Sequence, residues 1–289
     1  MVAGQESQTE VSDTQSTVGF AEILANSHFQ MACMRPIYLA PSAWLEHLPF
    51  AFWLISQQRP QSLVELGAHY GCSYFAFCQA IEKLSLNTRS YAVDNWHGDE
   101  HSGFYGDEVY EAVSTHNDEL YSRFSRLVRS TFDEASGHFA DKSIDILHID
   151  GFHTFSAVQH DVETWMPKLS ERALLLLHDT NVRERGFGVS LVLDSLRATY
   201  PVFEFDHGHG LGVVGIGSIR EPGIQHLFDI ADQAGHRLRF ANFFARLGRS
   251  CADAYTVRKL RAQIATTARS LKAQPLKTDE GRGDATTKE

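Results

Sequence analysis

Short apolar runs alternate with amphipathic stretches between about residue 61 and residue 218. This alternation is typical of βαβ units, in which helices join parallel strands and cover the sheet. We predict strands at residues 62–66, 90–94, 126–129, 145–150, 173–178, 202–206 and 211–216. The last two flank the glycine-containing run D-H-G-H-G (206–210) and should form an antiparallel hairpin. The pattern therefore predicts an α/β domain with a mostly parallel sheet.

Two of the connecting segments show apolar positions at helical spacing, so we expect their helices to pack on the sheet. These positions are Val158, Val162, Trp165 and Leu169 in one segment, and Val189, Val192 and Leu196 in the other.

The chain outside this domain divides into four segments. Residues 1–18 are rich in polar residues and are predicted to be disordered. Residues 19–60 are predicted to form a helical cap that Pro36 and Pro41 interrupt, and residues 219–275 a helical extension. Residues 276–289 form a second tail that we expect to be disordered.

The C-terminal extension carries an apolar stripe at roughly helical intervals, consisting of Val257, Leu260, Ile264 and Leu271. Such a stripe is typical of a short coiled coil or docking helix, which would make a homodimer plausible. A solvated helix with one apolar stripe explains it equally well.

Composition excludes several classes of protein. A formal net charge of -10 gives no general support for binding nucleic acid. No run is long and apolar enough to span a bilayer, and the polar N-terminus is unlike a signal peptide. The cysteines show no C-x-x-C spacing, so we interpret them as reduced thiols of a cytoplasmic protein, namely Cys33, Cys72, Cys78 and Cys251.

Polar residues gather where four of the predicted strands end. The runs are V-E-L-G-A-H-Y-G (64–71), Y-A-V-D (91–94), D-I-L-H-I-D-G-F-H (145–153) and L-L-L-L-H-D (174–179). The carboxyl ends of parallel strands meet at one edge of the sheet, where α/β folds bind ligands. We therefore expect these side chains to surround a single crevice.

The turn Glu65 to Gly71 has the spacing E-x-G-x-x-x-G. It is neither the dinucleotide pattern G-x-G-x-x-G nor a P-loop, so a phosphate ligand is not favoured. Glycine at Gly67 and Gly71 allows a ligand to approach the backbone closely, with Glu65 and Ala68 beside it. A tight structural turn is the alternative interpretation.

Asp94 lies 27 positions after Gly67, at the end of the next strand. An acid there can accept hydrogen bonds from both hydroxyls of a ribose. An acid and a glycine turn without a phosphate cradle favour an adenosine cofactor that lacks phosphates, and S-adenosyl-L-methionine is the leading candidate. Thr131 and Phe132, just past the third strand, would supply a polar edge contact and an apolar face for adenine.

The segment N-W-H-G-D-E-H-S-G-F-Y-G-D-E-V-Y (95–110) is glycine-rich, acidic and aromatic, and it starts at the same edge. We interpret it as a lid over the substrate rather than a structural loop. The residues expected to contact substrate are Trp96, His97, Asp99 and Tyr105.

Residues 61–218 resemble a class I S-adenosylmethionine-dependent methyltransferase of the methyltransferase-24 group. Five segments carry the resemblance in order: V-E-L-G-A-H-Y-G, D-N-W-H-G-D-E-H-S-G-F-Y-G-D-E-V-Y, D-I-L-H-I-D-G-F-H-T-F with D-V-E-T-W, H-D-T-N-V-R-E-R-G-F-G-V, and F-D-H-G-H-G-L-G-V-V-G-I-G. The group includes sugar O-methyltransferases and domains beside or fused to bacterial glycosyltransferases. F-F-A-R-L-G (243–248) and the helix after it also resemble the segment C-terminal to such domains in glycosyltransferase fusions.

The resemblance implies a Rossmann-like, seven-stranded sheet and O-methylation of a hydroxyl on a sugar or glycan. It also implies a Mg²⁺ site formed by acids at the fourth and fifth strand ends, which Asp150 and Asp179 match. His178 stands where the related enzymes have a further acid, and histidine is a poorer ligand for magnesium. Manganese or no metal are therefore alternatives. L-S-E-R-A (169–173) replaces a turn that usually contains glycine.

For the chemistry, we expect Asp150 to hold the metal and His153 or His178 to take the proton of the hydroxyl. His153 is favoured because it lies past the strand, whereas strand alternation would turn His178 away. His148 is interpreted as a hydrogen-bonded core residue. His207 and His209 either border the acceptor or belong to a plain turn.

Other classes of function stay open. A metal-dependent hydrolase would use the His/Asp cluster directly, but it leaves Glu65, Gly67 and Asp94 unexplained. A non-catalytic methyltransferase-like module would partner a glycosyltransferase through its C-terminal helix. A nicotinamide enzyme is disfavoured, because G-x-G-x-x-G is absent.

Overall fold

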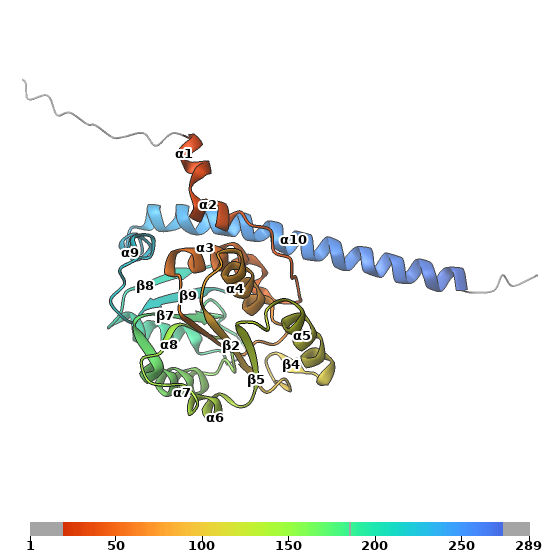
Figure 1. The fold of residues 1–289 in the computed structure, drawn as a ribbon, viewed down its shortest axis with the longest axis horizontal. Coiled ribbons are helices and arrows are strands. Elements are labelled where there is room, and N and C mark those ends of the chain that lie inside the picture. The colour runs from red at the N-terminus through yellow and green to blue at the C-terminus, as the bar shows by residue number, and fades with distance from the viewer. Residues whose placement is uncertain (1–19, 185, 274–289) are drawn as a thin grey trace, which may run out of the picture.

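The computed structural model describes residues 20–184 and 186–273, so both tails expected to be disordered lie outside the described residues. A seven-stranded sheet forms the centre of the molecule, in the order β5-β2-β1-β6-β7-β9-β8 (Figure 1). All neighbouring strands are parallel except β9, which runs antiparallel to both β7 and β8. The strands are β1 (Ser62–Leu66), β2 (Arg89–Asp94), β5 (Ser125–Arg129), β6 (Ile144–Ile149), β7 (Leu169–His178), β8 (Val202–Phe205) and β9 (Leu211–Gly215). This confirms the predicted fold class and its C-terminal hairpin.

One predicted boundary is wrong, because β7 begins at Leu169 and not at residue 173. L-S-E-R-A is extended, and it bulges where the register shifts between Ile144 and Ile146 of β6. The bulge contains no glycine, and polar contacts stabilise it. Arg172 bonds the Gln58 carbonyl and pairs with Glu221, and Ser170 donates to Asp145 at 2.7 Å. Leu169 therefore belongs to the strand and not to the preceding helix.

Helices cover both faces of the sheet. Because side chains alternate along a strand, Leu174 and Leu176 join one core and Leu175 and Leu177 the other. The first core contains α2 (Ser27–Ala32), α3 (Leu48–Gln58), α4 (Cys72–Lys83), α5 (Asp107–Leu120), α9 (Pro222–Asp229) and the start of α10 (Ala234–Ala273). The second contains α6 (Phe132–Ser136), α7 (Phe155–Trp165) and α8 (Val189–Arg197).

The remaining elements are short. α1 (Phe20–Ala25) precedes α2, η1 (Ala43–His47) leads into α3, and η2 (Met166–Lys168) ends the α7 segment. Pro167 lies in η2, where the missing amide hydrogen ends the α-helix before Leu169. β3 (Gly98–Asp99) and β4 (Gly103–Phe104) pair as a two-stranded ribbon outside the main sheet.

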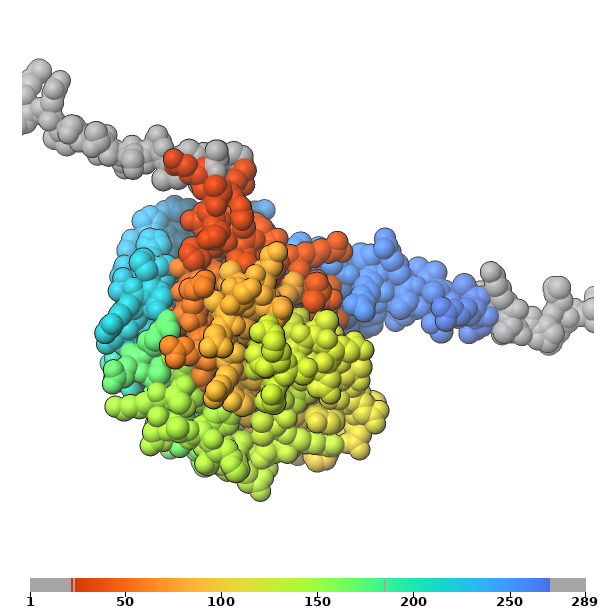
Figure 2. Space-filling model, in the orientation of Figure 1, coloured from red at the N-terminus to blue at the C-terminus, as the bar shows by residue number. Residues whose placement is uncertain are grey.

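Helix α10 has two parts with different surroundings. Phe244 and Cys251 in its first part are buried against the body of the molecule. The second part projects away from the body (Figures 1 and 2), where Val257, Leu260 and Ile264 are exposed. The side chain of Leu271 lies outside the described part of the chain. No helix in the described ranges is long and apolar enough to cross a membrane.

Candidate active site

A cavity of about 560 Å³ lies at the carboxyl ends of the parallel strands. It brings together most of the residues that the sequence singled out, which are Gly67, Ala68, Asp94, Asp99, Tyr105, Thr131, Phe132, Asp150, His153, His178 and Asp179. Four other candidates, all among the described residues, do not line it: Glu65, Gly71, Trp96 and His97.

Glu65 is a structural residue and not a cofactor ligand, which corrects our prediction. Its side chain is 0% exposed, and it accepts hydrogen bonds from Ser73 at 2.8 Å and from His148 Nδ1 at 3.1 Å. The indole of Trp44 donates to His148 Nε2 at 3.1 Å. Since an indole only donates, the proton of neutral His148 must lie on Nδ1. Burial raises the pKa of Glu65, although His148 opposes this. The expectation of a core His148 is confirmed.

The two glycines of the turn have different roles. Gly67 has φ +88°, and a Cβ there would lie 2.0 Å from the carbonyl oxygen of Asp150. Glycine is therefore required for the end of β1 to pass against the end of β6. Gly71 also has positive φ and is the N-cap of α4, where a Cβ would lie 2.6 Å from the ring of Phe75. It does not line the cavity, although its neighbours Tyr70 and Cys72 do. For Gly71, the structural-turn interpretation is the correct one.

Asp94 lines the cavity on the side of β2. Its two carboxylate oxygens accept hydrogen bonds from the backbone amides of His69 at 2.9 Å and Trp96 at 2.7 Å. Burial raises its pKa, and these two amides oppose the rise. A carboxylate has about four lone-pair positions, so acceptor capacity remains on the side facing the cavity.

Thr131 has a task that the sequence did not indicate. Its hydroxyl caps α6 by accepting from the Glu134 amide at 3.2 Å, while Phe132 begins that helix. Both residues still line the cavity beside Asp94.

The lid segment contributes fewer side chains to the cavity than expected. Trp96 is fully buried, and its indole donates to the His69 carbonyl at 3.0 Å. His97 is exposed. Neither residue lines the cavity: Trp96 fixes this segment to the His69 carbonyl, and substrate contact by His97 stays a prediction.

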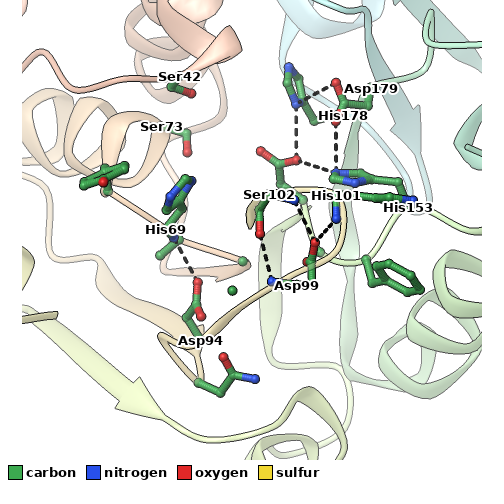
Figure 3. A pocket seen from close by; sticks show the side chains of 18 of the residues that line it. Ser42, His69, Ser73, Asp94, Asp99, His101, Ser102, His153, His178 and Asp179 are labelled. Atoms are coloured by element: carbon green, nitrogen blue, oxygen red, sulfur yellow. Dashed lines mark hydrogen bonds and ion pairs between the residues drawn. The ribbon is translucent and has the colours of Figure 1, made fainter. Parts of the chain in front are cut away.

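Asp99 and Tyr105 do line the cavity. Asp99 accepts from the amides of His101 and Ser102, at 2.6 and 2.7 Å, and so shapes the tip of the β3–β4 ribbon. The ring of Tyr105 stacks on His69 with centroids 4.7 Å apart. In Figure 3, Asp99 and Ser102 lie between Asp94 on one side and the histidine cluster on the other.

That cluster consists of Asp150, His153, His178 and Asp179, at the ends of β6 and β7 (Figure 3). His153 Nε2 lies 2.9 Å from Asp179 Oδ2 and 3.4 Å from Asp150 Oδ1. His178 Nδ1 lies 3.2 Å from Asp150, and its Nε2 donates to the Gly208 carbonyl at 3.0 Å. The expectation that His178 turns away is wrong. Strand alternation stops before Asp179, whose φ is +61°, so both side chains reach the same cluster.

The carboxyl and imidazole groups of this cluster shift one another's pKa values. Burial disfavours protonation of His153, yet its hydrogen bonds to Asp150 and Asp179 raise its pKa to about 9. Burial likewise opposes protonation of His178, but Asp150 raises the pKa of that imidazole. Burial alone would raise the pKa of Asp150, whereas His178 and His153 hold it well below its usual range. At neutral pH His153 is therefore mostly protonated, and its Nε2 faces the carboxyl groups of Asp150 and Asp179.

The same cluster has a donor set that fits a divalent cation. Ligand atoms of Asp150, His153 and Asp179 all lie within 4.8 Å of one another. Two carboxylates and one imidazole suit manganese, iron or zinc better than magnesium, which prefers oxygen donors. A cation would have to displace the proton of His153.

Several cavity residues were not among the site residues predicted from the sequence. His209, for which the sequence allowed either the acceptor site or a plain turn, lies 3.0 Å from Asp179 Oδ1, whereas His207 packs on His47 outside the cavity. Rings of His101, Phe152 and Phe187 form a stack beside His153. Asp161 on α7 also lines the cavity. The sequence could have indicated Asp161, because this acid lies one turn from Val158 and from Trp165 on the apolar face of the helix.

Comparison with known proteins points to one class of domain. Residues 64–180 match the model of the Methyltransf_24 family, described as a methyltransferase domain. The "Uncharacterized protein y4gI" of Sinorhizobium fredii is 51% identical over 181 residues, which is 62% of this chain. The chain spans only 20% of that relative's length.

Three of the solved structures with a similar chain are methyltransferases by their titles. A putative caffeoyl-CoA O-methyltransferase from Staphylococcus aureus is 16% identical over 62% of this chain and 85% of its own, with a TM-score of 0.46. A methyltransferase from Geobacter sulfurreducens is 22% identical over 67% and 88%, with a TM-score of 0.45. TomG from Streptomyces achromogenes, in complex with SAM, is 10% identical over 67% and 91%, with a TM-score of 0.46. The family match supports a methyltransferase domain in residues 64–180.

Proposed function

We propose that this chain is an S-adenosylmethionine-dependent O-methyltransferase that acts on a hydroxyl of a sugar or glycan. The observation that carries the proposal is one cavity lined by both Asp94 and the Asp150–His153–Asp179 cluster. Asp94 supplies the acceptor that a ribose needs, and the cluster supplies groups that orient and deprotonate a hydroxyl. The match to a methyltransferase domain supports the methyl-transfer part of this assignment.

S-adenosylmethionine, the methyl donor, would bind on the β1–β2 side of the cavity. Asp94 accepts hydrogen bonds from the ribose, Gly67 and Ala68 let the backbone approach the ligand, and Phe132 offers an apolar face to adenine. When bound, S-adenosylmethionine supplies an electrophilic methyl group on sulfur. Alignment of this methyl with the acceptor hydroxyl would contribute much of the rate.

His153 would act as the base that removes the proton of the acceptor hydroxyl. Nε2 of this imidazole is held by Asp179 and Asp150, while Nδ1 is buried without a hydrogen-bond partner in the described ranges. Nδ1 is therefore the atom available for the proton, and Asp179 orients the ring through Nε2–H. Phe187 stacks on His153 at 4.5 Å, so an acceptor reaches Nδ1 only if the surrounding aromatic residues shift. His178 is less suited, because both of its ring nitrogens are engaged.

A divalent cation, if one is used, would be held by Asp150 and Asp179. If His153 also bound it through Nε2, the ring proton would stay on Nδ1, and the hydroxyl would then be activated by the cation instead of His153. The cation would act as a Lewis acid that lowers the pKa of the hydroxyl. The donor set favours manganese over Mg²⁺.

The acid variants test this assignment. We expect Asp150→Asn and Asp179→Asn to lower methyl transfer from radiolabelled S-adenosylmethionine to deoxy-sugar nucleotides or glycans by at least ~100-fold, because each orients the base. Affinity for S-adenosylhomocysteine should change little. Asp194→Asn on α8, whose side chain is 70% exposed, is the matched control. Near-normal rates in both cluster variants would contradict the proposal.

Two alternatives have distinct signatures. A metal-dependent hydrolase would turn over substrate with a cation and no methyl donor. A non-catalytic module would bind the donor and methylate no acceptor. The glycosyltransferase partner and the homodimer, both through the exposed part of α10, stay predictions.

A further inference from the structure

Asp161 is a buried acid that the mechanism above does not use. It lies on α7 with only 8% of its surface exposed, on the helix face that carries Val158 and Trp165. Acids on such a face are rare unless they are paired. Asp161 also lines the cavity that holds Asp94.

The carboxyl of Asp161 has no hydrogen-bond donor within residues 20–184 and 186–273. The neighbouring acids of the cavity are satisfied: Asp94 by two backbone amides, and Asp179 by His153 and His209. His160, the residue before Asp161, pairs with Asp133 at 2.7 Å instead. Burial raises the pKa of Asp161 to about 7, with His160 opposing the rise. The carboxyl of Asp161 lines the cavity, so it can accept a hydrogen bond from a ligand that enters there.

The position of Asp161 relative to Phe132 indicates what kind of ligand the carboxyl could bind. A Cβ on Gly151 would lie 2.5 Å from Phe132 Cε2 and 3.6 Å from Asp161 Oδ2. The ring edge and the carboxyl therefore converge on Gly151, where only a residue without a side chain fits. A flat base stacked on Phe132 would place its edge against Asp161.

We propose that Asp161 accepts a hydrogen bond from the exocyclic amino group of the donor's adenine and thereby selects the base. This inference rests on the proposed function. Above its pKa of about 7, Asp161 is ionised and can only accept. The ring nitrogens N1, N3 and N7 of adenine also only accept, so the 6-amino group is the edge group that complements the carboxylate. A site built to bond a polar group discriminates against an analogue that lacks it, because the protein group is then left unpaired.

The test compares two ligands on three proteins by calorimetry with the full chain. The ligands are S-adenosylhomocysteine and its analogue with unsubstituted purine in place of adenine. We expect the wild-type protein to prefer the adenine ligand at least ~10-fold, and Asp161→Ala to reduce that preference to about 1. Asp133→Asn is the matched control, because Asp133 lines the same part of the cavity but pairs with His160. It should keep the preference.

The outcomes separate the two proposals. If the wild-type protein binds S-adenosylhomocysteine and Asp161→Ala keeps the full preference, or if Asp133→Asn loses it instead, this inference is overturned and the proposed function stands. If the folded wild-type protein does not bind S-adenosylhomocysteine, the proposed function fails and the inference fails with it. Thermal denaturation of Asp161→Ala shows that it folds, and we expect its melting temperature without ligand to be at least that of the wild type.

Discussion

His153 is the residue on which the chemistry of this site depends most. Two carboxylates surround one of its ring nitrogens, and an aromatic stack covers the ring. A group whose pKa is about 9 is mostly protonated at neutral pH, so it accepts a proton only after losing its own. Without a cation, the site therefore favours activity at alkaline pH, where His153 has lost its proton.

A pH titration tests this account of His153. We expect its imidazole NMR signals to titrate near pH 9, and Asp179→Asn to move the midpoint toward 6.5, because one of the two carboxylates is lost. The pKa in the folded state is raised, so the stability that His153 contributes is fully present below about pH 6.5 and is lost as pH rises through about 9. A midpoint near 6.5 in the wild-type protein would contradict the charge distribution described above.

The sequence predicted some residues of the cavity correctly and misassigned or missed others. Asp94, Asp150 and Asp179 were correctly expected to share one crevice, because strand ends meet at one edge of the sheet. Glu65 and Trp96 were misassigned because sequence position alone does not show which way a side chain turns at a strand end or in a loop. Asp161 was overlooked, since the pattern of α7 was interpreted only through its apolar members.

At the scale of elements, α10 combines two environments in one helix. Two aromatic rings of α3 pack against Phe244 and fix the first part of α10: Phe50 lies 5.5 Å and Trp53 5.9 Å away, measured between ring centroids. The apolar residues of the second part have no such surroundings in the described ranges. The sequence predicted a helix with an apolar stripe, but it did not show which part packs, since that depends on where η1 and α3 lie.

Two truncations in α10 separate these environments. We expect Phe244→Ala to lower the free energy of unfolding by about 3–5 kcal/mol, because it leaves a cavity in the aromatic cluster. Ile264→Ala, at a residue 68% exposed, should change it by less than about 0.5 kcal/mol. Urea denaturation followed by circular dichroism measures both. A large loss of stability in Ile264→Ala would mean that the projecting part packs against something in solution, such as a second copy of the chain.

At the scale of the whole molecule, the strand pattern was enough to predict the sheet. β1 was predicted without error, and β2, β5, β6, β8 and β9 to within one residue at each end. The reason is that both faces of this sheet are covered, so each strand is a short apolar run between polar turns. The bulge at the start of β7 was not predictable, because distant partners of Arg172 and Ser170 stabilise it.

The central claim is that the crevice between Asp94 and the Asp150–Asp179 cluster binds the methyl donor. Calorimetric titration of the full chain with S-adenosylhomocysteine tests it most directly. We predict one site with a dissociation constant on the order of micromolar, weakened at least ~10-fold in Asp94→Ala and retained in Asp150→Asn. No binding by the folded wild-type protein, or binding that Asp94→Ala leaves unchanged, would contradict the account.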